Sequence, residues 1–397
     1  MKRIIVLNEM HPDEQPGAAT IAMDYALELS KIENVLYLTT STGEKVQSTE
    51  RLSVRYLKRK HRITLGGYAG EFLKVLFDFF GFFRAAYYCL KIRQERPESI
   101  WVHQIGNYIP RLTLLFLPVF APVLMTVHDY GLIVPRKLYP NDISAVNLMN
   151  LSVKTKRADL SVANRLQKFL VNLAYRLRRS ILKFYVRKIK VVCISQQQAE
   201  IYRLFGYRVH AVIANGINLC TCSQEAGATR TNSVLFLGRV NGKGLDRLLI
   251  GASDSGIELL LAGSQDLVDY VAKCAPKLNF KYLGRLNRSE VFMEMHRTSL
   301  VYLASTCFDV YPTVGLEAIR HGAIPIVSDT TGLRDLVNQI DSSLVLNANS
   351  LSVPLKQYFE MMQVKRDELE KNLWSVNNEI MTVTQSLNKY LSLMQTS

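Results

Sequence analysis

Two acidic residues, Asp309 and Glu317, stand eight positions apart in the segment FDVYPTVGLEAIRHGAIPIVSD. An apolar run at Leu300–Leu303 precedes them and predicts a buried strand, and a helical pattern opens near Thr313. Ligands of open α/β sheets bind at the carboxyl ends of strands, so both acids are expected to face one ligand. Carboxylates bind sugar hydroxyls well. The alternative is a loop Asp and a helical Glu that only suits the helix dipole.

A second segment, VLFLGRVNGKGLDRLL, combines glycines and bases in a way that suits a phosphate group. A strand is expected to end at Leu237, Gly238 permits a tight turn, and a helix begins at Leu245. Free N–H groups at a helix start attract anions, and Arg239 and Lys243 add two positive charges. The segment is neither a Walker loop nor a dinucleotide fingerprint. Alone, it fits a generic strand–helix turn with surface bases equally well.

Two histidines directly follow apolar runs and are further candidates. His128 follows Val123–Val127, and His103 follows Trp101 and Val102. By position alone, a loop histidine with satisfied hydrogen bonds is as plausible as a catalytic one. The sequence contains no nucleophile-elbow motif and no His-Glu-x-x-His motif.

These candidates need a scaffold that brings strand ends together, and the apolar pattern predicts two such scaffolds. Short apolar runs without alternation suit parallel strands covered on both faces. Two series of runs alternate with helical patterns, which predicts an α/β chain of two doubly wound, Rossmann-like domains. The runs are Ile4–Leu7, Val35–Leu38, Ile100–Val102, Val123–Val127 and Val191–Ile194, then Val234–Leu237, Leu259–Ala262, Phe280–Leu283, Leu300–Leu303 and Ile324–Val327.

The predicted domain boundary lies in the segment IANGIN, because Asn-Gly is a turn signal and the chain that follows is small and polar. We therefore expect an N-terminal domain of residues 1–212 and a C-terminal domain of residues 213–375. Residues 376–397 are expected to form a helix that packs back on the N-terminal domain.

The net charge of +15 over 397 residues favours anionic partners: nucleic acid, acidic lipid headgroups or phosphorylated small molecules. Many of the bases fall in residues 154–190, which contain one acid, Asp159. Seven apolar residues of this segment share one helical face: Leu166, Phe169, Leu170, Leu173, Leu177, Ile181 and Phe184. The simplest interpretation is a core-packing helix with a solvated basic face.

The sharper interpretation of this segment is a helix that lies on an acidic membrane surface. Residues 71–90 are crowded with aromatic side chains and could face a bilayer as well. Nucleic acid ranks third and is not expected as a partner, because the usual recognition motifs are absent.

Cysteine usage and hydropathy favour a cytoplasmic location. Six cysteines are scattered and only Cys220 and Cys222 lie close, so free thiols in a reducing compartment are expected rather than a zinc site. The apolar run at the N-terminus is too short for a signal peptide. The longest stretch without charge, residues 112–127, falls short of the roughly 20 residues of a spanning helix. We expect no transmembrane segment.

Four segments, in their order and spacing, resemble a known family: LFLGRVNGKG, LLLAGS, KYLGRL and DVYPTVGLEAIRHGAIPIVSD. They are similar to the C-terminal half of retaining glycosyltransferases of the family-four type, also described as glycosyl transferases group 1. Weaker similarity extends to NEMHPDEQPGAATIAMDYALEL, MTVHDYGLIVPR, VVCISQQQAE and VIANGIN. The resemblance implies the GT-B fold, in which two Rossmann-like domains face a central cleft.

The resemblance also implies a UDP- or GDP-sugar donor in the C-terminal domain, an acceptor in the N-terminal domain, and no cofactor or metal. Arg239 and Lys243 would bind the diphosphate. Glu317 would bind the ribose, and Asp309 would bind hydroxyls of the transferred sugar. His128 would line the sugar site, and with Arg239, Lys243 and Asp309 it makes up the implied catalytic set. The other implied donor-binding residues are Gly17, Gly238, Gly263, Arg285, Leu286, Thr313, Val314 and Gly315.

The chain departs from the family pattern at three positions. Asp309 stands where the family usually has Glu, and the spacing from Arg239 to Lys243 is one residue shorter. A single Gly17 replaces a pair of glycines. Each departure concerns one contact and leaves the arrangement of charges unchanged.

The resemblance and the basic and aromatic segments together predict a glycosyltransferase that docks on the inner face of the cell membrane. The expected acceptor is a lipid-linked saccharide of bacterial surface polysaccharide assembly, such as capsule, O-antigen or exopolysaccharide. The alternatives are a nucleotide-sugar epimerase or a phosphorylase on the same fold, and a non-catalytic basic binding protein.

Overall fold

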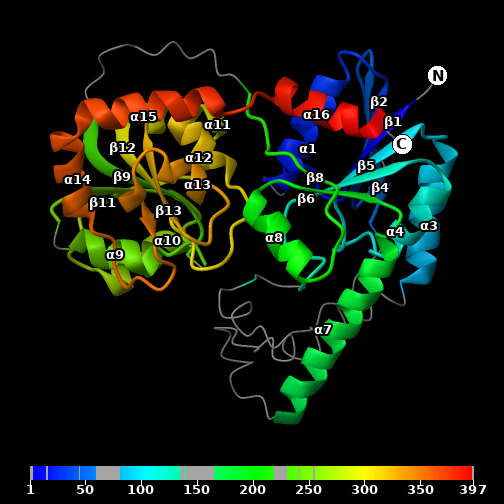
Figure 1. Ribbon diagram of the computed structural model, residues 1–397, viewed down its shortest axis with the longest axis horizontal. Helices are drawn as coiled ribbons and strands as arrows, with labels where there is room; N and C mark the ends of the chain where they lie inside the picture. Colours follow the sequence, from blue (N-terminus) through cyan, green and yellow to red (C-terminus); the bar gives the residue numbers. More distant parts are fainter. Residues whose placement is uncertain are drawn as a thin grey trace. The chain divides into compact units, whose positions relative to one another are not determined.

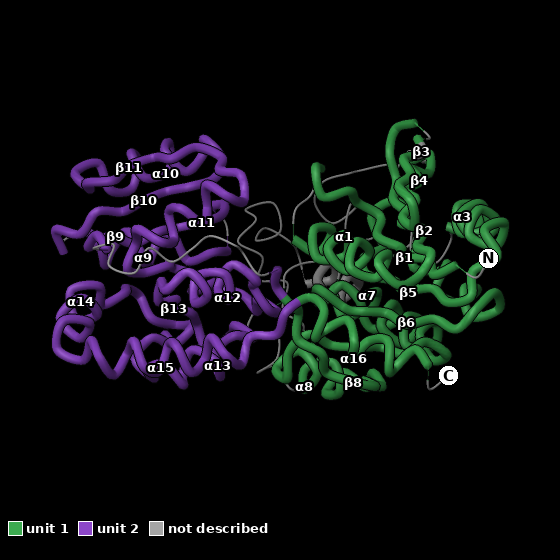
Figure 2. Tube along the Cα trace, turned by 90° about the horizontal axis from the view of Figure 1, so that it is seen from above, with its two compact units in different colours: residues 1–216, 383–397 green, residues 217–382 purple. Residues whose placement is uncertain are grey.

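The structure is a computed structural model that describes residues 3–395 except 15–16, 44, 60–80, 135–137, 139–164, 219–229, 241 and 254. The chain divides into two compact units, shown in Figure 2. Unit 1 comprises Met1–Gly216 and Val383–Ser397, and unit 2 comprises Ile217–Thr382. Cys220, Cys222 and much of the predicted aromatic segment lie outside the described residues.

Unit 1 is built on a sheet of eight strands among its described residues, in the order β3-β4-β2-β1-β5-β6-β7-β8. The pairs are parallel except β3 with β4. The central strands are buried along their length because helices cover the sheet (Figure 1). The strands are β1 (Ile4–Asn8), β2 (Val35–Ser41), β3 (Lys45–Ser48), β4 (Leu52–Lys58), β5 (Ser99–Gln104), β6 (Val123–Val127), β7 (Lys190–Cys193) and β8 (Ala211–Val212).

The helices of unit 1 connect these strands, and the last one comes from the C-terminal end of the chain. Helix α16 packs against α1, where the Tyr25 and Ser386 hydroxyls lie 2.6 Å apart. Ser386 also donates to the Ala214 carbonyl at 2.8 Å. The described helices are α1 (Ala18–Leu29), α3 (Phe82–Gln94), α4 (Thr113–Phe116), η1 (Leu117–Val119), α7 (Arg165–Tyr185), α8 (Gln196–Leu204) and α16 (Val383–Gln395).

Unit 2 contains a parallel sheet in the order β11-β10-β9-β12-β13-β14. Its strands are β9 (Thr231–Gly238), β10 (Glu258–Gly263), β11 (Phe280–Gly284), β12 (Thr298–Leu303), β13 (Ile324–Ser328) and β14 (Val345–Leu346). Its helices are α9 (Leu245–Ser253), α10 (Asp266–Cys274), α11 (Arg288–Arg297), α12 (Thr313–Arg320), α13 (Arg334–Asn338), η2 (Ser342–Leu344), α14 (Leu355–Val364) and α15 (Arg366–Glu379).

The predicted α/β architecture of two doubly wound units is confirmed, and each predicted apolar run overlaps a strand. The chain enters and leaves unit 2 side by side, since the Ile217 amide donates to the Met381 carbonyl at 3.0 Å. The first segment of unit 1 ends at Gly216, inside the predicted IANGIN segment. Helix α15 continues to Glu379, so the terminal helix begins at Val383 rather than at residue 376.

Helix α7 exposes three side chains of the apolar face that the simplest interpretation of the sequence placed in the core. Leu173, Leu177 and Phe184 are 41%, 54% and 46% exposed. The opposite face anchors the helix, because the buried Arg178 donates from Nη2 to the Gly131 carbonyl at 2.7 Å. The core-packing interpretation is therefore wrong for these three side chains.

Within the described part of the chain, no helix combines the length and the apolar character needed to cross a membrane.

Candidate functional site

The loop after β12 places Asp309 at the carboxyl end of the unit 2 sheet. Its backbone is held against the loop after β13: the Asp309 amide donates to the Thr330 carbonyl at 3.2 Å, and the Gly332 amide donates to the Asp309 carbonyl at 2.8 Å. The Ser328 hydroxyl joins the same loops by donating to the Ser305 carbonyl at 2.8 Å. These hydrogen bonds fix the position from which the Asp309 carboxylate projects.

Asp309 and Lys243 form an ion pair, although 66 positions separate them in the sequence. Lys243 Nζ lies 2.5 Å from Asp309 Oδ2, and the Ser305 hydroxyl donates to the same oxygen at 3.1 Å. The two side chains are 37% and 22% exposed, so a ligand can reach both. The structure thus joins the predicted phosphate-binding base and the predicted sugar-binding acid at one point.

The turn between β9 and α9 approaches this loop closely enough to require glycine. Gly244 has a φ of 72°, and a Cβ at this position would lie 2.3 Å from the Ala304 carbonyl oxygen. The Thr306 amide donates to the Gly242 carbonyl at 3.2 Å. The turn therefore packs on the loop that carries Asp309, which brings Lys243 to it. Arg239 is exposed at the start of the turn.

Glu317 lies in α12, where it is largely buried and paired with a cation. Its Oε1 accepts from Arg288 Nη2 at 2.9 Å. Arg288 is the first residue of α11, which begins with a capping box of Asn287 and Glu290. The sequence analysis missed Arg288, although a base at a helix start just beyond the predicted strand 280–283 was the available signal. The arginine orients the Glu317 carboxylate through this charge-assisted hydrogen bond.

The remaining candidates of unit 2 lie at the same edge of the sheet. Gly238 ends β9 and Gly263 ends β10, and a Cβ on Gly263 would lie 2.2 Å from the Gly238 carbonyl oxygen. Arg285 and Leu286 follow β11. The partly exposed Thr313 and Val314 begin α12 and are followed by Gly315, whose Cβ would meet Leu333 Cδ1 at 2.4 Å.

Unit 1 holds the two other candidates. Gly17 precedes α1 with a φ of 96°, and no atom lies within 4 Å of where its Cβ would stand. His128 follows β6, and its Nε2 lies 2.9 Å from Nδ1 of His103, which sits within β5. Burial lowers the pKa of His128 to about 4 and that of His103 well below its ordinary value, so both rings are neutral at pH 7.

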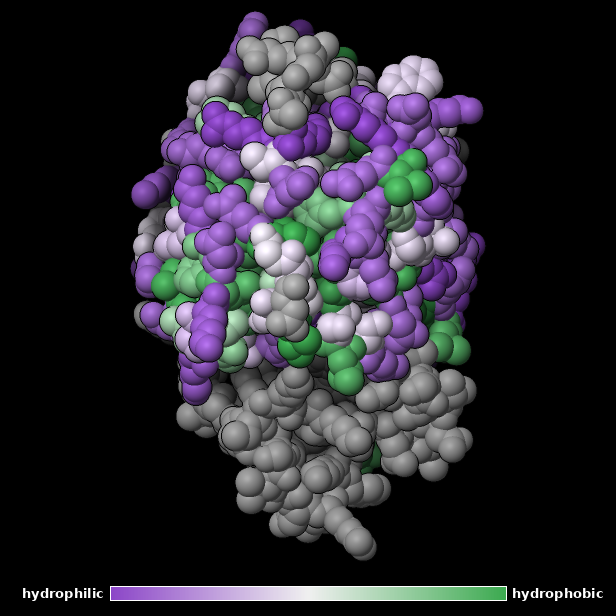
Figure 3. Space-filling view, turned by 90° about the vertical axis from the view of Figure 1, so that its left-hand side faces the viewer, coloured by the Kyte–Doolittle hydropathy of each residue, from purple (hydrophilic) through white to green (hydrophobic). Residues whose placement is uncertain are grey.

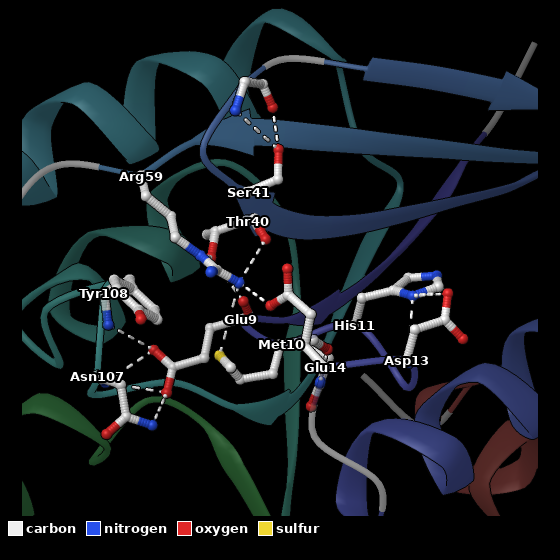
Figure 4. A network of polar contacts seen from close by, with 12 residues as sticks. Glu9, Met10, His11, Asp13, Glu14, Thr40, Ser41, Arg59, Asn107 and Tyr108 are labelled. Atoms are coloured by element: carbon white, nitrogen blue, oxygen red, sulfur yellow. Dashed lines mark hydrogen bonds and ion pairs between the residues drawn. The ribbon is translucent and has the colours of Figure 1, made fainter.

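A buried carboxylate that the sequence analysis missed organises the neighbouring strand ends of unit 1 (Figure 4). Glu9 follows β1 and is fully buried. Its carboxylate accepts hydrogen bonds from the backbone amides of Gly106, Asn107 and Tyr108 at 2.8–3.0 Å. Burial raises the pKa of Glu9, while the amides of Tyr108 and Asn107 and the Arg111 charge act in the opposite direction. The carboxylate therefore ties the loop after β5 to the end of β1.

Arg59 is part of the same network of polar contacts in Figure 4. It pairs with Glu14, donates to the Thr40 carbonyl at 3.0 Å and lies 4.4 Å from the centre of the Tyr108 ring. The ends of β1, β2, β4 and β5 thus share one set of polar contacts. Among the described residues, no group of three His, Cys, Asp or Glu side chains is placed to hold a metal ion.

The part of the chain that matches a known family contains the strand ends of unit 2. Residues 223–353 match the model of the family Glycosyl transferases group 1. This range includes every unit 2 candidate, from Gly238 to Glu317. No curated protein sequence matches the chain.

Solved structures of several glycosyltransferases are similar over the whole chain. HepE from Anabaena, solved in complex with UDP-glucose, is 15% identical over 100% of both chains, with a TM-score of 0.65. Sucrose-phosphate synthase from Thermosynechococcus elongatus is 12% identical over 100% of this chain and 99% of its own, with a TM-score of 0.69. WaaG, a glycosyltransferase involved in lipopolysaccharide biosynthesis, is 11% identical over 99% of both chains, with a TM-score of 0.62.

At these identities the structural likeness shows the fold, and the predicted GT-B fold is confirmed. The match to the glycosyl transferases group 1 covers residues 223–353, which lie in unit 2.

Proposed function

We propose that this chain transfers a sugar from a UDP- or GDP-sugar to a saccharide acceptor, with retention of configuration and without a metal ion. The observation that carries the proposal is the ion pair of Lys243 and Asp309. In a nucleotide sugar the transferred sugar is bonded directly to a phosphate. A cation for the phosphate and a carboxylate for the sugar hydroxyls must therefore stand side by side, as these two do. The UDP-glucose bound to HepE supports a nucleotide sugar as the donor.

The other roles extend from this pair. Glu317 would accept hydrogen bonds from the ribose hydroxyls, since a carboxylate can accept several donors besides Arg288. The amides at the start of α12, at Thr313, Val314 and Gly315, would favour the diphosphate. The glycines that end β9 and β10 would admit the phosphates, and the nucleotide base would lie by the loop after β11.

The charges suit a reaction in which the nucleoside diphosphate leaves. As the bond from the anomeric carbon to the phosphate oxygen breaks, negative charge grows on the phosphate. Lys243 and Arg239 would stabilise this charge. The acceptor hydroxyl attacks from the leaving-group face and its proton passes to the departing phosphate. No carboxylate nucleophile is then required, unlike in retaining glycosidases.

A thermal-shift screen of the wild-type protein against nucleotide sugars and their nucleoside diphosphates tests the proposal. Ligands that bind the folded state raise the melting temperature by mass action. We expect at least one nucleotide sugar to do so and unrelated nucleotides of equal charge to do so less. A protein that responds to none of the nucleotides would contradict the proposed function.

We further propose that the acceptor is a lipid-linked saccharide of bacterial surface polysaccharide, and that unit 1 docks on the cytoplasmic face of the membrane. The support is an exposed apolar row on α7 in a chain with a net charge of +15. Phe83 of α3 and Val119 of η1 are also exposed, and α4 packs against both α3 and α7. By contrast, the face of unit 2 in Figure 3 is mostly hydrophilic with scattered apolar groups.

Sedimentation with vesicles tests this docking. The wild-type protein should sediment with vesicles rich in phosphatidylglycerol and not with neutral ones, and added salt should weaken binding. The double variant Leu173→Ser and Leu177→Ser should lose most of the vesicle binding. It removes apolar area that docking would bury in the bilayer, and each Å² of such area contributes about 25 cal/mol. Leu204→Ser, at a 48% exposed site on α8, is the matched control. Failure to bind acidic vesicles would contradict the docking and leave the donor proposal standing.

A further inference from the structure

Helices α11 and α12 lie side by side in unit 2 and meet along a seam of matched side chains (Figure 1). Arg288, Phe292 and His296 follow one another at intervals of four positions and therefore share one face of α11. Glu317 and His321 have the same spacing at the end of α12. Arg288 contacts Glu317, Phe292 stacks on His321, and His296 contacts His321. The seam therefore joins the Glu317 end of α12 to the whole length of α11.

The guanidinium group of Arg288 is held from two sides within this seam. Its Nη2 donates to Glu317 Oε1 at 2.9 Å, and its Cζ lies 5.6 Å from the centre of the Phe292 ring. A cation at this distance from an aromatic ring is attracted to it. Phe292 is itself buried and stacks on the His321 ring, with the centroids 4.4 Å apart. The position of the Arg288 charge is thus fixed by the packing of α11 against α12.

The orientation of the Glu317 carboxylate decides what this carboxylate can bind. The side chain of Glu317 is 12% exposed, whereas that of Arg288 is 39% exposed. A carboxylate oxygen accepts hydrogen bonds near the plane of the carboxylate group. A largely buried carboxylate can therefore reach a hydroxyl only if this plane is turned toward it. Arg288 sets the plane, because rotation of the carboxylate would break the charge-assisted hydrogen bond at Oε1.

We propose that Arg288 is a positioning residue that turns the Glu317 carboxylate toward the ribose hydroxyls and so makes the site selective for ribonucleotides over deoxyribonucleotides. Arg288 acts through Glu317 and does not itself contact the nucleotide. The inference rests on the proposed function, because it requires the ribose at Glu317. A site built to bind a hydroxyl by hydrogen bonds discriminates strongly against the analogue that lacks the hydroxyl. Without Arg288 this discrimination should be lost.

Calorimetric titration with UDP, GDP and their dideoxy analogues, which lack both ribose hydroxyls, tests this role. The wild type should bind UDP or GDP about 10- to 100-fold more tightly than the dideoxy analogue, as expected for hydrogen bonds to a charged acceptor. Arg288→Met should lower this ratio about 10-fold by weakening only the ribonucleotide. Arg288→Lys, which keeps a cation, should give a ratio between these two. Arg297→Met, which removes a 69% exposed arginine at the end of the same helix, should keep the wild-type ratio.

An unchanged ratio in Arg288→Met, or an equal loss for both kinds of nucleotide, would overturn the proposal and leave the ion pair as a structural contact of α11 with α12. If Arg288→Met does not fold, Arg288→Gln takes its place with the same expectation. In Glu317→Gln, adding Arg288→Met should lower the ratio no further, and a further loss would show that Arg288 does not act through Glu317. A wild type that binds both kinds of nucleotide equally overturns this inference alone. A wild type that binds neither UDP nor GDP overturns the proposed function as well.

Discussion

Lys243→Met is expected to slow release of nucleoside diphosphate from the donor by about 100- to 1,000-fold, the usual cost of removing one preorganised charge-stabilising group. Methionine keeps most of the length of the lysine side chain and removes only its charge. The loss should fall mainly on kcat, because the negative charge on the phosphate grows as the glycosidic bond breaks. Single-turnover assays with a donor identified by the thermal-shift screen measure this rate.

The control is Lys356→Met, because Lys356 is an exposed lysine on α14 of the same unit. It should leave the rate within a factor of about two, as surface substitutions away from sites do. If Lys243→Met is as fast as this control, Lys243 does not stabilise the leaving group. The ion pair with Asp309 would then be a structural contact of the strand-end loops.

Glu9→Ala is expected to destabilise the protein by about 3–5 kcal/mol. The change leaves the amides of Gly106, Asn107 and Tyr108 without their buried acceptor, and each orphaned group costs about 1–3 kcal/mol. Glu9→Gln should fall between wild type and Glu9→Ala, because its amide offers one accepting oxygen in place of two. Urea unfolding measures the change in the free energy of unfolding.

Hydrogen exchange locates the effect of Glu9. In Glu9→Ala the amides of residues 106–108 should exchange much faster than in the wild type. Glu33→Ala is the matched control, since Glu33 is exposed just before β2 in the same unit. Unchanged protection of residues 106–108 in Glu9→Ala would show that the loop after β5 is held by other contacts.

The sequence predicted what depends on local pattern. Apolar runs without alternation located the buried strands but not β3, β4, β8 and β14. The ends of the predicted strands located Asp309 and the turn at Lys243, because parallel strands bring their carboxyl ends together. That these two side chains touch also depends on Gly244, which lets the turn approach the Ala304 carbonyl. The sequence suggested a tight turn but not the loop against which it packs.

What the sequence could not predict depends on distant partners. The amides that donate hydrogen bonds to Glu9 lie nearly a hundred positions away in the sequence. His103 meets His128 only because β5 pairs with β6. The simplest interpretation of residues 154–190, a core-packing helix, was wrong for Leu173, Leu177 and Phe184. Periodicity identifies an apolar face but not the side that packs, which is fixed here by the contact of Arg178 with the loop after β6.

The most direct test of the central claim, that the Lys243–Asp309 pair marks where phosphate and sugar meet, is calorimetric titration of Asp309→Asn. The asparagine keeps the shape and removes the charge that pairs with Lys243. Affinity for the nucleoside diphosphate should stay equal or rise, because Lys243 is released to bind phosphate. Affinity for the nucleotide sugar should fall about 10-fold or more, since hydrogen bonds to charged groups contribute about 1.5–3 kcal/mol. An equal loss for both ligands, or no loss for either, would contradict the account.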